Sequence, residues 1–351
     1  MANIEGSLFP ILEQKPLTGV AKLAAEAEDA GERYQIEFRA LKVRSILNWS
    51  VSKRRTWAVY SVNPYRGCEF GCKYCFARYA HTFMAETMGE GEYADPKTFE
   101  RRIFIKQNAP WLVEQELRKV SAEEEIAIGT ATDPYQPAER VARVTRGILE
   151  VLARREGLRI GIITKSNLIV RDIDLLREIA QRSSLSLHVT ITTPDVELAR
   201  KLEPRAPRPD LRFAAVRALR EAGLRAGIMN CPLLPGITDN AIAMGEMARR
   251  AKEVDASFLA ANSLFLKPCS KPTYMEFVGE HFPALLEMTE KRFAESAFAP
   301  KPYAKRMTEL LRAVCRKHGV GERALHATFT AEGRKTVRRV ESMPVQGRLF
   351  G

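Results

Sequence analysis

The sequence predicts an α/β fold in which a parallel sheet curls into a partial (β/α)6, TIM-like barrel. Two observations predict it: six short β-rich runs alternate with helix-like segments, and polar and cysteine motifs follow the ends of those runs. The segments before and after this region lack the alternation of β-rich runs and helix-like segments. We therefore expect an N-terminal leader and cap over 1–55, the core barrel over 56–270, a mainly helical, basic C-terminal extension over 271–340 and a flexible tail over 341–351.

The expected strands are short runs rich in apolar and β-branched residues. They comprise residues 57–63, 125–132, 158–166, 185–193, 224–231 and 256–266. The segments between them have helical character and comprise residues 110–121, 138–155, 171–183, 195–202, 209–222 and 239–253. Strands that alternate with helices in this order favour parallel pairing.

The flanking regions are less regular than the barrel. Residues 34–49 partly alternate and predict a small strand-rich cap, whereas residues 282–318 predict mainly helices. Residues 324–340 contain a basic stretch that fits either a strand or a helix.

Composition narrows the class of protein. The chain has 351 residues, 45% of them hydrophobic, which is enough for a large core. Three of the six cysteines lie within eight residues, which indicates metal binding in a reducing compartment rather than a disulfide scaffold. The N-terminus lacks the basic-then-apolar pattern of a signal peptide, and no apolar run approaches the roughly 20 residues that span a bilayer. We therefore expect a cytoplasmic protein.

The charge of the chain is positive and concentrated at one end. The formal net charge is +12, and residues 301–351 hold twelve Lys or Arg against four Glu, a net charge of +8. A basic field of this kind favours a polyanionic partner such as nucleic acid. The alternative is a solvated face that keeps the protein soluble, and charge alone does not separate the two.

Cys68, Cys72 and Cys75 follow the first expected strand with the spacing C-x3-C-x2-C. Three thiolates can hold three irons of a 4Fe–4S cluster and leave the fourth iron open to a small ligand. Structural zinc usually has four ligands in paired knuckles, and a ferredoxin-like cluster has a fourth cysteine. His81 is the nearest candidate for a fourth ligand, because the remaining cysteines are isolated at Cys231, Cys269 and Cys315. The motif therefore predicts a catalytic cluster.

With the aromatic Tyr74 just before the third cysteine, this motif resembles the signature of the radical S-adenosylmethionine (SAM) superfamily. GTATDPYQPAE (129–139), TKSNLIVRDIDLL (164–176), ITTPD (191–195), LEPRAPRPDLR (202–212) and PLLPGITD (232–239) resemble its spore photoproduct lyase-like branch. The resemblance covers roughly residues 55–270. It implies that SAM binds the open iron and that an electron from the cluster cleaves SAM to a 5′-deoxyadenosyl radical, which abstracts hydrogen. We also expect an electron donor such as a flavodoxin or ferredoxin.

The resemblance assigns further residues to SAM binding. They are Tyr74, Gly129, Thr130, Asp133, Lys165 and Thr192. Each has a structural alternative: Asp133 can cap a helix that begins at Pro134, Lys165 can pair with Asp133 or Glu203, and Thr192 suits a strand. Similarly, Glu203, Arg205 and Arg212 either line the barrel mouth or form a surface salt-bridge network.

The chain departs from the lyase at the end of the second strand. In spore photoproduct lyase a cysteine there donates a hydrogen atom to the product radical, whereas this chain has Thr130 and Ala131. A threonine O–H bond is too strong for that role, so the resemblance does not imply thymine-dimer reversal. Cys231 is the candidate hydrogen-atom donor, with Cys269 as a second; otherwise each is a small buried hydrophobe.

The end of the chain carries a second candidate motif. Gln346, Leu349 and Phe350 form Gln-x-x-Leu-Phe, which resembles the peptide by which bacterial replication and repair proteins dock on the DNA polymerase sliding clamp. A Leu–Phe pair tucked onto the core is the alternative. The preceding basic residues are candidates for phosphate contacts and comprise Arg334, Lys335, Arg338 and Arg339.

These features favour a radical SAM enzyme that acts on nucleic acid, in DNA repair, a lyase-like reaction or base modification. Two rivals stay open: a radical SAM enzyme that modifies a protein or small molecule, and a non-enzymatic iron–sulfur protein that binds the clamp. The first rival predicts no salt-dependent DNA affinity, and the second predicts no 5′-deoxyadenosine.

Overall fold

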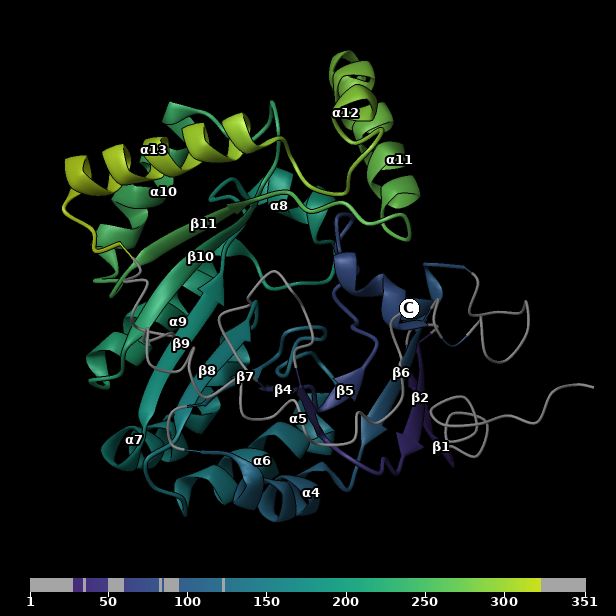
Figure 1. The fold of residues 1–351 in the computed structure, drawn as a ribbon, viewed down its shortest axis with the longest axis vertical. Coiled ribbons are helices and arrows are strands. Elements are labelled where there is room, and N and C mark those ends of the chain that lie inside the picture. The colour runs from purple at the N-terminus through teal and green to yellow at the C-terminus, as the bar shows by residue number, and fades with distance from the viewer. Residues whose placement is uncertain are drawn as a thin grey trace, which may run out of the picture.

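The computed structural model describes residues 28–33, 36–49, 60–81, 84, 95–121 and 124–322 (Figure 1). Within them, the larger sheet has the order β11–β10–β9–β8–β7–β4–β3. Its parallel strands are β4 (Tyr60–Val62), β7 (Glu125–Ile128), β8 (Arg159–Thr164), β9 (Ser184–Thr190), β10 (Ala226–Leu233) and β11 (Leu259–Ser263). Strand β3 (Leu47–Trp49) pairs antiparallel with β4. The mixed α/β architecture and its parallel sheet confirm the predicted partial barrel.

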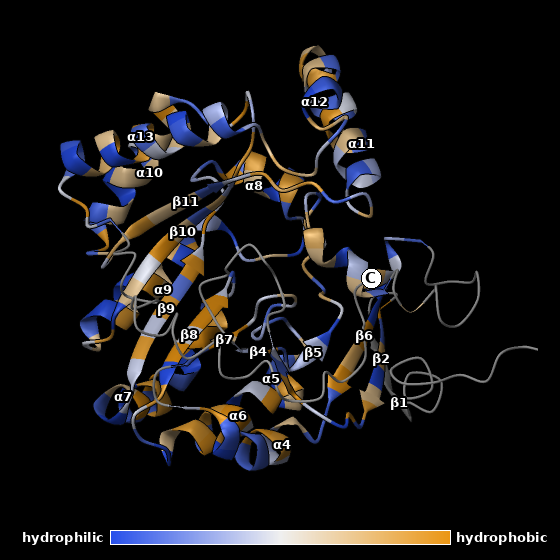
Figure 2. Cartoon of the chain, viewed as in Figure 1, coloured by the Kyte–Doolittle hydropathy of each residue, from blue (hydrophilic) through white to orange (hydrophobic). Residues whose placement is uncertain are grey.

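Helices connect the parallel strands as the alternation predicted. They are α4 (Ala109–Glu116), α5 (Glu139–Ala142), α6 (Val144–Ala153), α7 (Ile173–Arg182), α8 (Val196–Leu202), α9 (Pro209–Glu221) and α10 (Ala241–Glu253). Figure 2 shows strands β7 and β8 as mainly hydrophobic, whereas the helices mix hydrophobic and hydrophilic residues. Each helix therefore buries one face; α7, for example, buries Leu175, Leu176 and Ile179.

A second, smaller sheet packs beside the barrel, with the order β1–β2–β6–β5. It comprises β1 (Glu28–Arg33), β2 (Ile36–Leu41), β5 (Tyr65–Arg66) and β6 (Arg102–Lys106). The sequence indicated strands only in its N-terminal part, because β5 is two residues long and β6 directly follows the short helix α3 (Thr98–Arg101). This sheet matters for function, since β5 leads straight into the cysteine motif.

The C-terminal extension is helical over its described part. It contains α11 (Lys271–His281), α12 (Leu286–Arg292) and α13 (Lys301–His318), with α13 beside α10 (Figure 1). Among the described residues, no helix has both the length and the apolar character to cross a membrane. The predicted phosphate contacts and the terminal clamp peptide, from Arg334 to Phe350, lie outside the described residues.

Candidate active site

The three motif cysteines lie in the loop between β5 and the 3-10 helix η1 (Phe76–Arg78). Parts of the chain far away in sequence fix the backbone of this loop. The Cys68 N–H donates to the Phe99 carbonyl (3.0 Å) and the Lys73 N–H to the Leu202 carbonyl (2.9 Å). The buried Gln136 side chain accepts from the Glu69 N–H (2.9 Å) and donates to the Gly67 carbonyl (3.2 Å). The loop is therefore held by contacts with three separate parts of the chain.

Two arginines complete this support. Arg78 is fully buried and donates to the Cys72 carbonyl (3.1 Å) and the Pro96 carbonyl (2.8 Å), while Glu100 pairs with it at 3.0 Å. Arg205 reaches from the far side of the loop and donates to the Glu69 carbonyl. Both cations therefore act on the loop backbone, where hydrogen bonds to charged groups are the stronger kind.

The thiols sit in apolar surroundings. Cys72 is buried, Cys68 and Cys75 are partly buried, and all three pack in an apolar cluster with Phe70 and Leu264. Burial raises the pKa of all three thiols, that of Cys72 to about 12. A bound metal group must therefore displace protons from these sulfurs.

The three thiols lie on one loop that the protein backbone and side chains hold in place. A 4Fe–4S cluster is held one thiolate per iron, so its ligands surround a volume instead of converging on a point. Three thiols on one fixed loop suit this arrangement.

The other nearby metal-binding side chains have different surroundings. The ring of His81 packs edge-on against Phe99, with centroids 5.3 Å apart, and burial lowers its pKa to about 3. The Cys269 thiol is 3.7 Å from the Phe76 carbonyl and donates to it. Packing against an aromatic ring is typical of a core histidine, and the hydrogen bond of Cys269 directs its thiol toward the backbone after Cys75.

A buried polar network lies behind the cysteine loop. The Tyr74 hydroxyl and the Thr192 hydroxyl both bond the Glu203 Oε1 atom, the latter at 2.7 Å, and lie 2.8 Å apart. The other Glu203 oxygen pairs with the Arg212 Nη1 atom at 2.5 Å, and both charged side chains are only 1% exposed. The pair is therefore buried, so of the two alternatives the surface salt-bridge network does not hold for these two residues.

The charge of Glu203 is stabilised by its neighbours. Burial opposes ionisation, but Arg212, Lys165 and the Tyr74 hydroxyl outweigh it and lower the pKa of Glu203. The Lys165 ammonium lies 5.7 Å from the centroid of the Tyr74 ring. Burial also opposes the charge of Lys165, yet its electrostatic interactions with Cys72 and Glu203 raise its pKa. The lysine is thus a partly buried cation beside both the tyrosine and the cysteines.

Asp133 connects the ends of two neighbouring strands. Its Oδ1 atom accepts from the Thr164 hydroxyl (2.6 Å) and the Tyr135 N–H (2.9 Å), and its Oδ2 atom accepts from the Lys165 N–H (2.6 Å). These bonds cross from the turn after β7 to the end of β8. The carboxylate therefore positions the backbone of Lys165.

Asn63 organises the turn that contains Gly129 and Thr130. Its Oδ1 atom accepts from the Ala131 N–H (2.9 Å) and the Thr132 N–H (3.3 Å), and its amide donates to the Thr130 hydroxyl (3.3 Å). Gly129 has φ +89°, and a Cβ atom there would lie 2.4 Å from the Ile163 carbonyl oxygen. Only glycine fits at this close approach of two strand ends.

Cys231 lies within β10, partly buried, and its carbonyl accepts from the Thr192 hydroxyl (3.2 Å). Next to it, the buried Asn230 amide donates to the Ile191 and Thr192 carbonyls (3.0 and 2.8 Å). The structure thus brings Cys231 to the same strand ends as Thr192 and, through Glu203, Tyr74.

Sequence reasoning missed several residues that build the site. Asn63, Arg78 and Gln136 hold the cysteine loop and the strand-end turn. Asn63 and Gln136 contact residues more than 60 positions away, and Arg78 also reaches Pro96 and Glu100. The position of Asn63 and Arg78 next to the cysteine motif is the only sequence signal for them, and Gln136 lies in the GTATDPYQPAE segment.

Comparisons with known proteins agree with this geometry. Residues 62–247 match the family model described as the Radical SAM superfamily. The chain is 30% identical over 275 residues to the uncharacterized protein Rv2578c of Mycobacterium tuberculosis (strain ATCC 25618 / H37Rv), covering 78% of each protein. It is 31% identical over 189 residues to the uncharacterized protein MJ0683 of Methanocaldococcus jannaschii, covering 54% of this chain and 66% of that protein.

Among solved structures, the fold is similar to that of spore photoproduct lyase. A variant of that enzyme with bound AdoMet and dinucleoside spore photoproduct matches with a TM-score of 0.55 and 14% identity, covering 80% of this chain and 79% of the other. At this identity the similarity shows the shared fold.

Proposed function

The chain belongs to the radical SAM superfamily, and from this premise we propose that it is an enzyme that acts on nucleic acid, in DNA repair or base modification. Members of the superfamily use a 4Fe–4S cluster and SAM, and the superfamily supports SAM cleavage by a radical mechanism. The observation that carries the proposal is the cysteine loop, fixed by distant residues and placed beside a buried network of polar and charged side chains.

The proposed roles follow from the contacts of each residue. Cys68, Cys72 and Cys75 would hold the cluster, which together with SAM supplies, when bound, a 5′-deoxyadenosyl radical for hydrogen abstraction. Lys165 provides a partly buried cation for a carboxylate. Tyr74 is oriented by Glu203 and presents its ring beside that cation.

Further residues at the strand ends would complete the SAM site. Thr192 places a hydroxyl on the same Glu203 oxygen as Tyr74. Gly129 and Thr130 shape the turn after β7, and Asp133 fixes the backbone of Lys165 while it keeps a carboxylate near the end of β8. Apart from Tyr74 and Glu203, these residues all lie at or just after the ends of β7, β8 and β9.

Two observations support a nucleic-acid substrate. The fold is shared with a lyase solved with a dinucleoside spore photoproduct, and the chain carries a net charge of +12, with +8 in its last 51 residues. We propose that Arg334, Lys335, Arg338 and Arg339 contact phosphates, which makes binding salt-sensitive. Cys231 is the proposed hydrogen-atom donor, since the strand-end cysteine of the lyase is replaced here by Thr130 and Ala131.

The test is anaerobic reconstitution of the full chain with iron and sulfide, reduction, and measurement of 5′-deoxyadenosine from SAM with and without ultraviolet-damaged DNA. We expect deoxyadenosine formation that DNA stimulates. Cys72→Ala should remove the cluster absorbance and the product, whereas Cys315→Ala, a buried cysteine of α13, should retain both. If the amount of 5′-deoxyadenosine is the same with and without DNA, the nucleic-acid substrate is rejected. If no 5′-deoxyadenosine forms under either condition, the enzymatic function is rejected.

We further propose that Gln346, Leu349 and Phe350 dock the chain on the DNA polymerase sliding clamp, with Leu and Phe in an apolar pocket and Gln in a directed hydrogen bond. The double variant Leu349→Ala, Phe350→Ala should lose clamp binding in a pull-down and keep its cluster. Unchanged clamp binding would reject this docking. An electron donor such as a flavodoxin or ferredoxin would reduce the cluster.

A further inference from the structure

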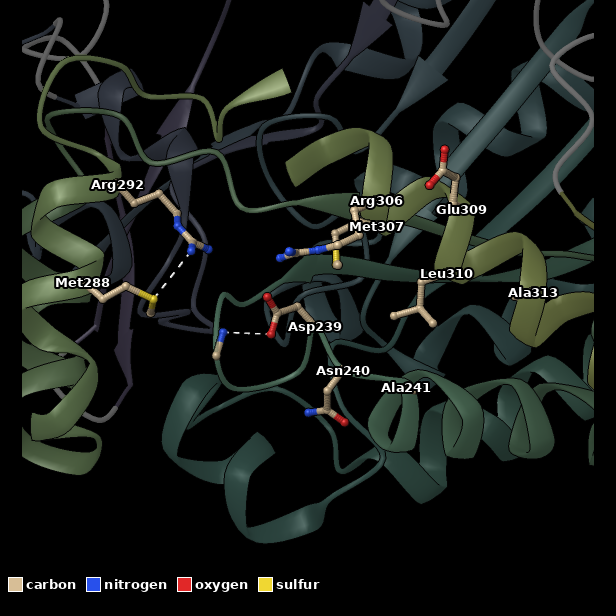
Figure 3. Close-up of a pocket in the computed structure, with 11 residues that line it drawn as sticks. Asp239, Asn240, Ala241, Met288, Arg292, Arg306, Met307, Glu309, Leu310 and Ala313 are labelled. Carbon is tan, nitrogen blue, oxygen red and sulfur yellow. Dashed lines mark hydrogen bonds between the residues drawn. The ribbon is translucent and has the colours of Figure 1, made fainter. Parts of the chain in front are cut away.

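A pocket of about 670 Å³ opens between the loop that follows β10 and the helices α12 and α13 (Figure 3). Met288, Met307 and Leu310 contribute apolar side chains to its wall. Arg292 of α12 lies beside Met288, Arg306 of α13 lies beside Met307, and Figure 3 shows the two guanidinium groups pointing toward one another. The pocket is thus amphipathic, with two cations aimed into one space.

Both cations lie against a single aromatic ring. The guanidinium carbons of Arg292 and Arg306 lie 4.7 and 5.6 Å from the centroid of Tyr303. The Tyr303 hydroxyl donates to the Asp239 Oδ2 atom (2.9 Å), which fixes the ring. Two like charges near one ring repel each other, so an anion between them would stabilise the arrangement.

The carboxylates of the pocket have other contacts. The Asp239 Oδ1 atom accepts from the Gly236 N–H (2.8 Å), so hydrogen bonds already occupy both oxygens of this residue. Glu309 lies 3.9 Å from the Lys305 ammonium on the same helix, and its carboxylate points away from the arginines in Figure 3. The Asp239 carboxylate lies near the two guanidinium groups in Figure 3, but each of its oxygens already accepts a hydrogen bond from another group.

Arg292 has an unused donor. Its Nη2 atom donates to the Met288 sulfur at 3.5 Å, a weak acceptor, and its Nη1 atom is buried without a hydrogen-bond partner among the described residues. A buried donor without a partner is destabilising, and more so when the group is charged. A ligand with several oxygens would satisfy it and bridge to Arg306.

We propose that this pocket binds a backbone phosphate of a nucleic-acid strand, with the phosphate oxygens on Arg292 and Arg306. Planar guanidinium groups suit phosphate geometry, and Met288, Met307 and Leu310 offer a surface for the adjoining sugar and base. The pocket adjoins the carboxyl end of β10, the edge of the sheet on which the cysteine loop also lies. The inference rests on the proposed function and extends it, since it gives the substrate strand a second contact away from the cluster.

The experiment measures binding of a short fluorescein-labelled single-stranded oligodeoxynucleotide to the reconstituted full chain by anisotropy, over a range of salt concentrations. Arg292→Gln and Arg306→Gln should each weaken binding about tenfold and reduce the slope of log affinity against log salt by about 0.7, the value for one phosphate contact on a single strand. The matched control Arg312→Gln removes an exposed arginine of α13 outside the pocket and should change neither quantity. Arg292→Lys keeps the positive charge, so its affinity for the oligonucleotide should fall between that of the wild type and that of Arg292→Gln. Circular dichroism and cluster absorbance verify each variant.

The outcomes separate this proposal from the proposed function. Equal losses in the pocket variants and in Arg312→Gln, or no loss in any of them, would overturn the pocket site. Oligonucleotide binding that depends on both pocket arginines, without DNA-stimulated deoxyadenosine formation, would support the pocket and reject the reaction. If only inorganic phosphate bound in an arginine-dependent manner, measured by calorimetry, the nucleic-acid source would be overturned.

Discussion

Replacement of Arg212 by methionine tests the buried network behind the cysteine loop. The Glu203–Arg212 pair is almost fully enclosed, with an oxygen–nitrogen distance of 2.5 Å. Arg212 also donates to the Pro207 carbonyl (2.7 Å) and the Thr190 carbonyl (3.2 Å). Methionine fills similar volume but leaves the Glu203 carboxylate buried without its strongest partner.

The magnitude follows from what remains around Glu203. Removal of one partner of a buried ion pair costs about 3–5 kcal/mol. The Lys165 ammonium and the Tyr74 hydroxyl also lower the pKa of Glu203 and stay in place in the variant. We therefore expect the lower end, a loss of about 3 kcal/mol in the free energy of unfolding. The double variant Arg212→Met, Glu203→Gln removes the stranded charge and should be about 1–2 kcal/mol more stable than Arg212→Met alone.

The pH dependence of the stability difference between the wild type and Arg212→Met provides a second test. In the wild type the pKa of Glu203 is lowered, so its stabilisation is present above the unfolded pKa of about 4.3 and is lost as the pH falls through the folded value. Without Arg212, burial raises the pKa of Glu203, so protonation at lower pH removes the unpaired buried charge and makes the variant more stable. The stability difference should shrink between about pH 7 and about pH 5 in urea titrations followed by circular dichroism. A difference that is equal at both pH values, or a double variant no more stable than Arg212→Met, would refute the account.

Two further predictions concern the backbone of the site. Asn63→Ala removes the acceptor for the Ala131 and Thr132 N–H groups, so it should lower the free energy of unfolding by about 2–3 kcal/mol and weaken SAM binding. Replacement of the exposed Asn48 by Ala is the control. Equal effects of the two substitutions would contradict the role of Asn63. Gly71→Ala, at φ +66°, places a Cβ atom 2.8 Å from the Arg205 Nη2 atom. Because Arg205 must shift and it donates to the Glu69 carbonyl in the cysteine loop, the variant should lower the iron content of the purified protein. The control Gly223→Ala, at φ +79° with no atom within 4 Å, carries the same conformational strain without the clash and should keep full iron content.

The sequence contained most of the fold because the relevant signals are local. Most parallel strands lie within runs rich in apolar residues, such as β7 and β8, and the helices carry their own period, as in α7 with its buried Leu175, Leu176 and Ile179. The cysteine motif is local too, since three ligands lie within eight residues. The small sheet was only partly predictable, because β5 has two residues and β2 meets β6 across a gap of more than 60 residues.

The supporting contacts of the site could not be predicted, because they join residues that only the fold brings together. Glu203 and Arg212 lie nine positions apart in a segment whose composition suits a solvated turn, and only burial makes them a pair. Tyr74 reaches Thr192 across 118 positions. The sequence shows which residue types lie at the strand ends. The partner of each polar group depends on the direction of its side chain in the fold, which the hydrophobic periodicity of the sequence does not determine.

The cysteine loop belongs to the small sheet's side of the chain but also contacts the barrel, through the Lys73 N–H and the Leu202 carbonyl, and this has a thermodynamic consequence. The chain leaves the barrel at β4, enters the small sheet at β5 and then forms the loop, whose first cysteine donates to the Phe99 carbonyl just before β6. Any group that binds the native loop and not the unfolded chain stabilises every contact that the loop requires. Cluster loading must therefore stabilise the docking of the small sheet on the barrel. By the same linkage, substitutions that loosen β6 must weaken cluster binding, even though no residue of that strand is a ligand.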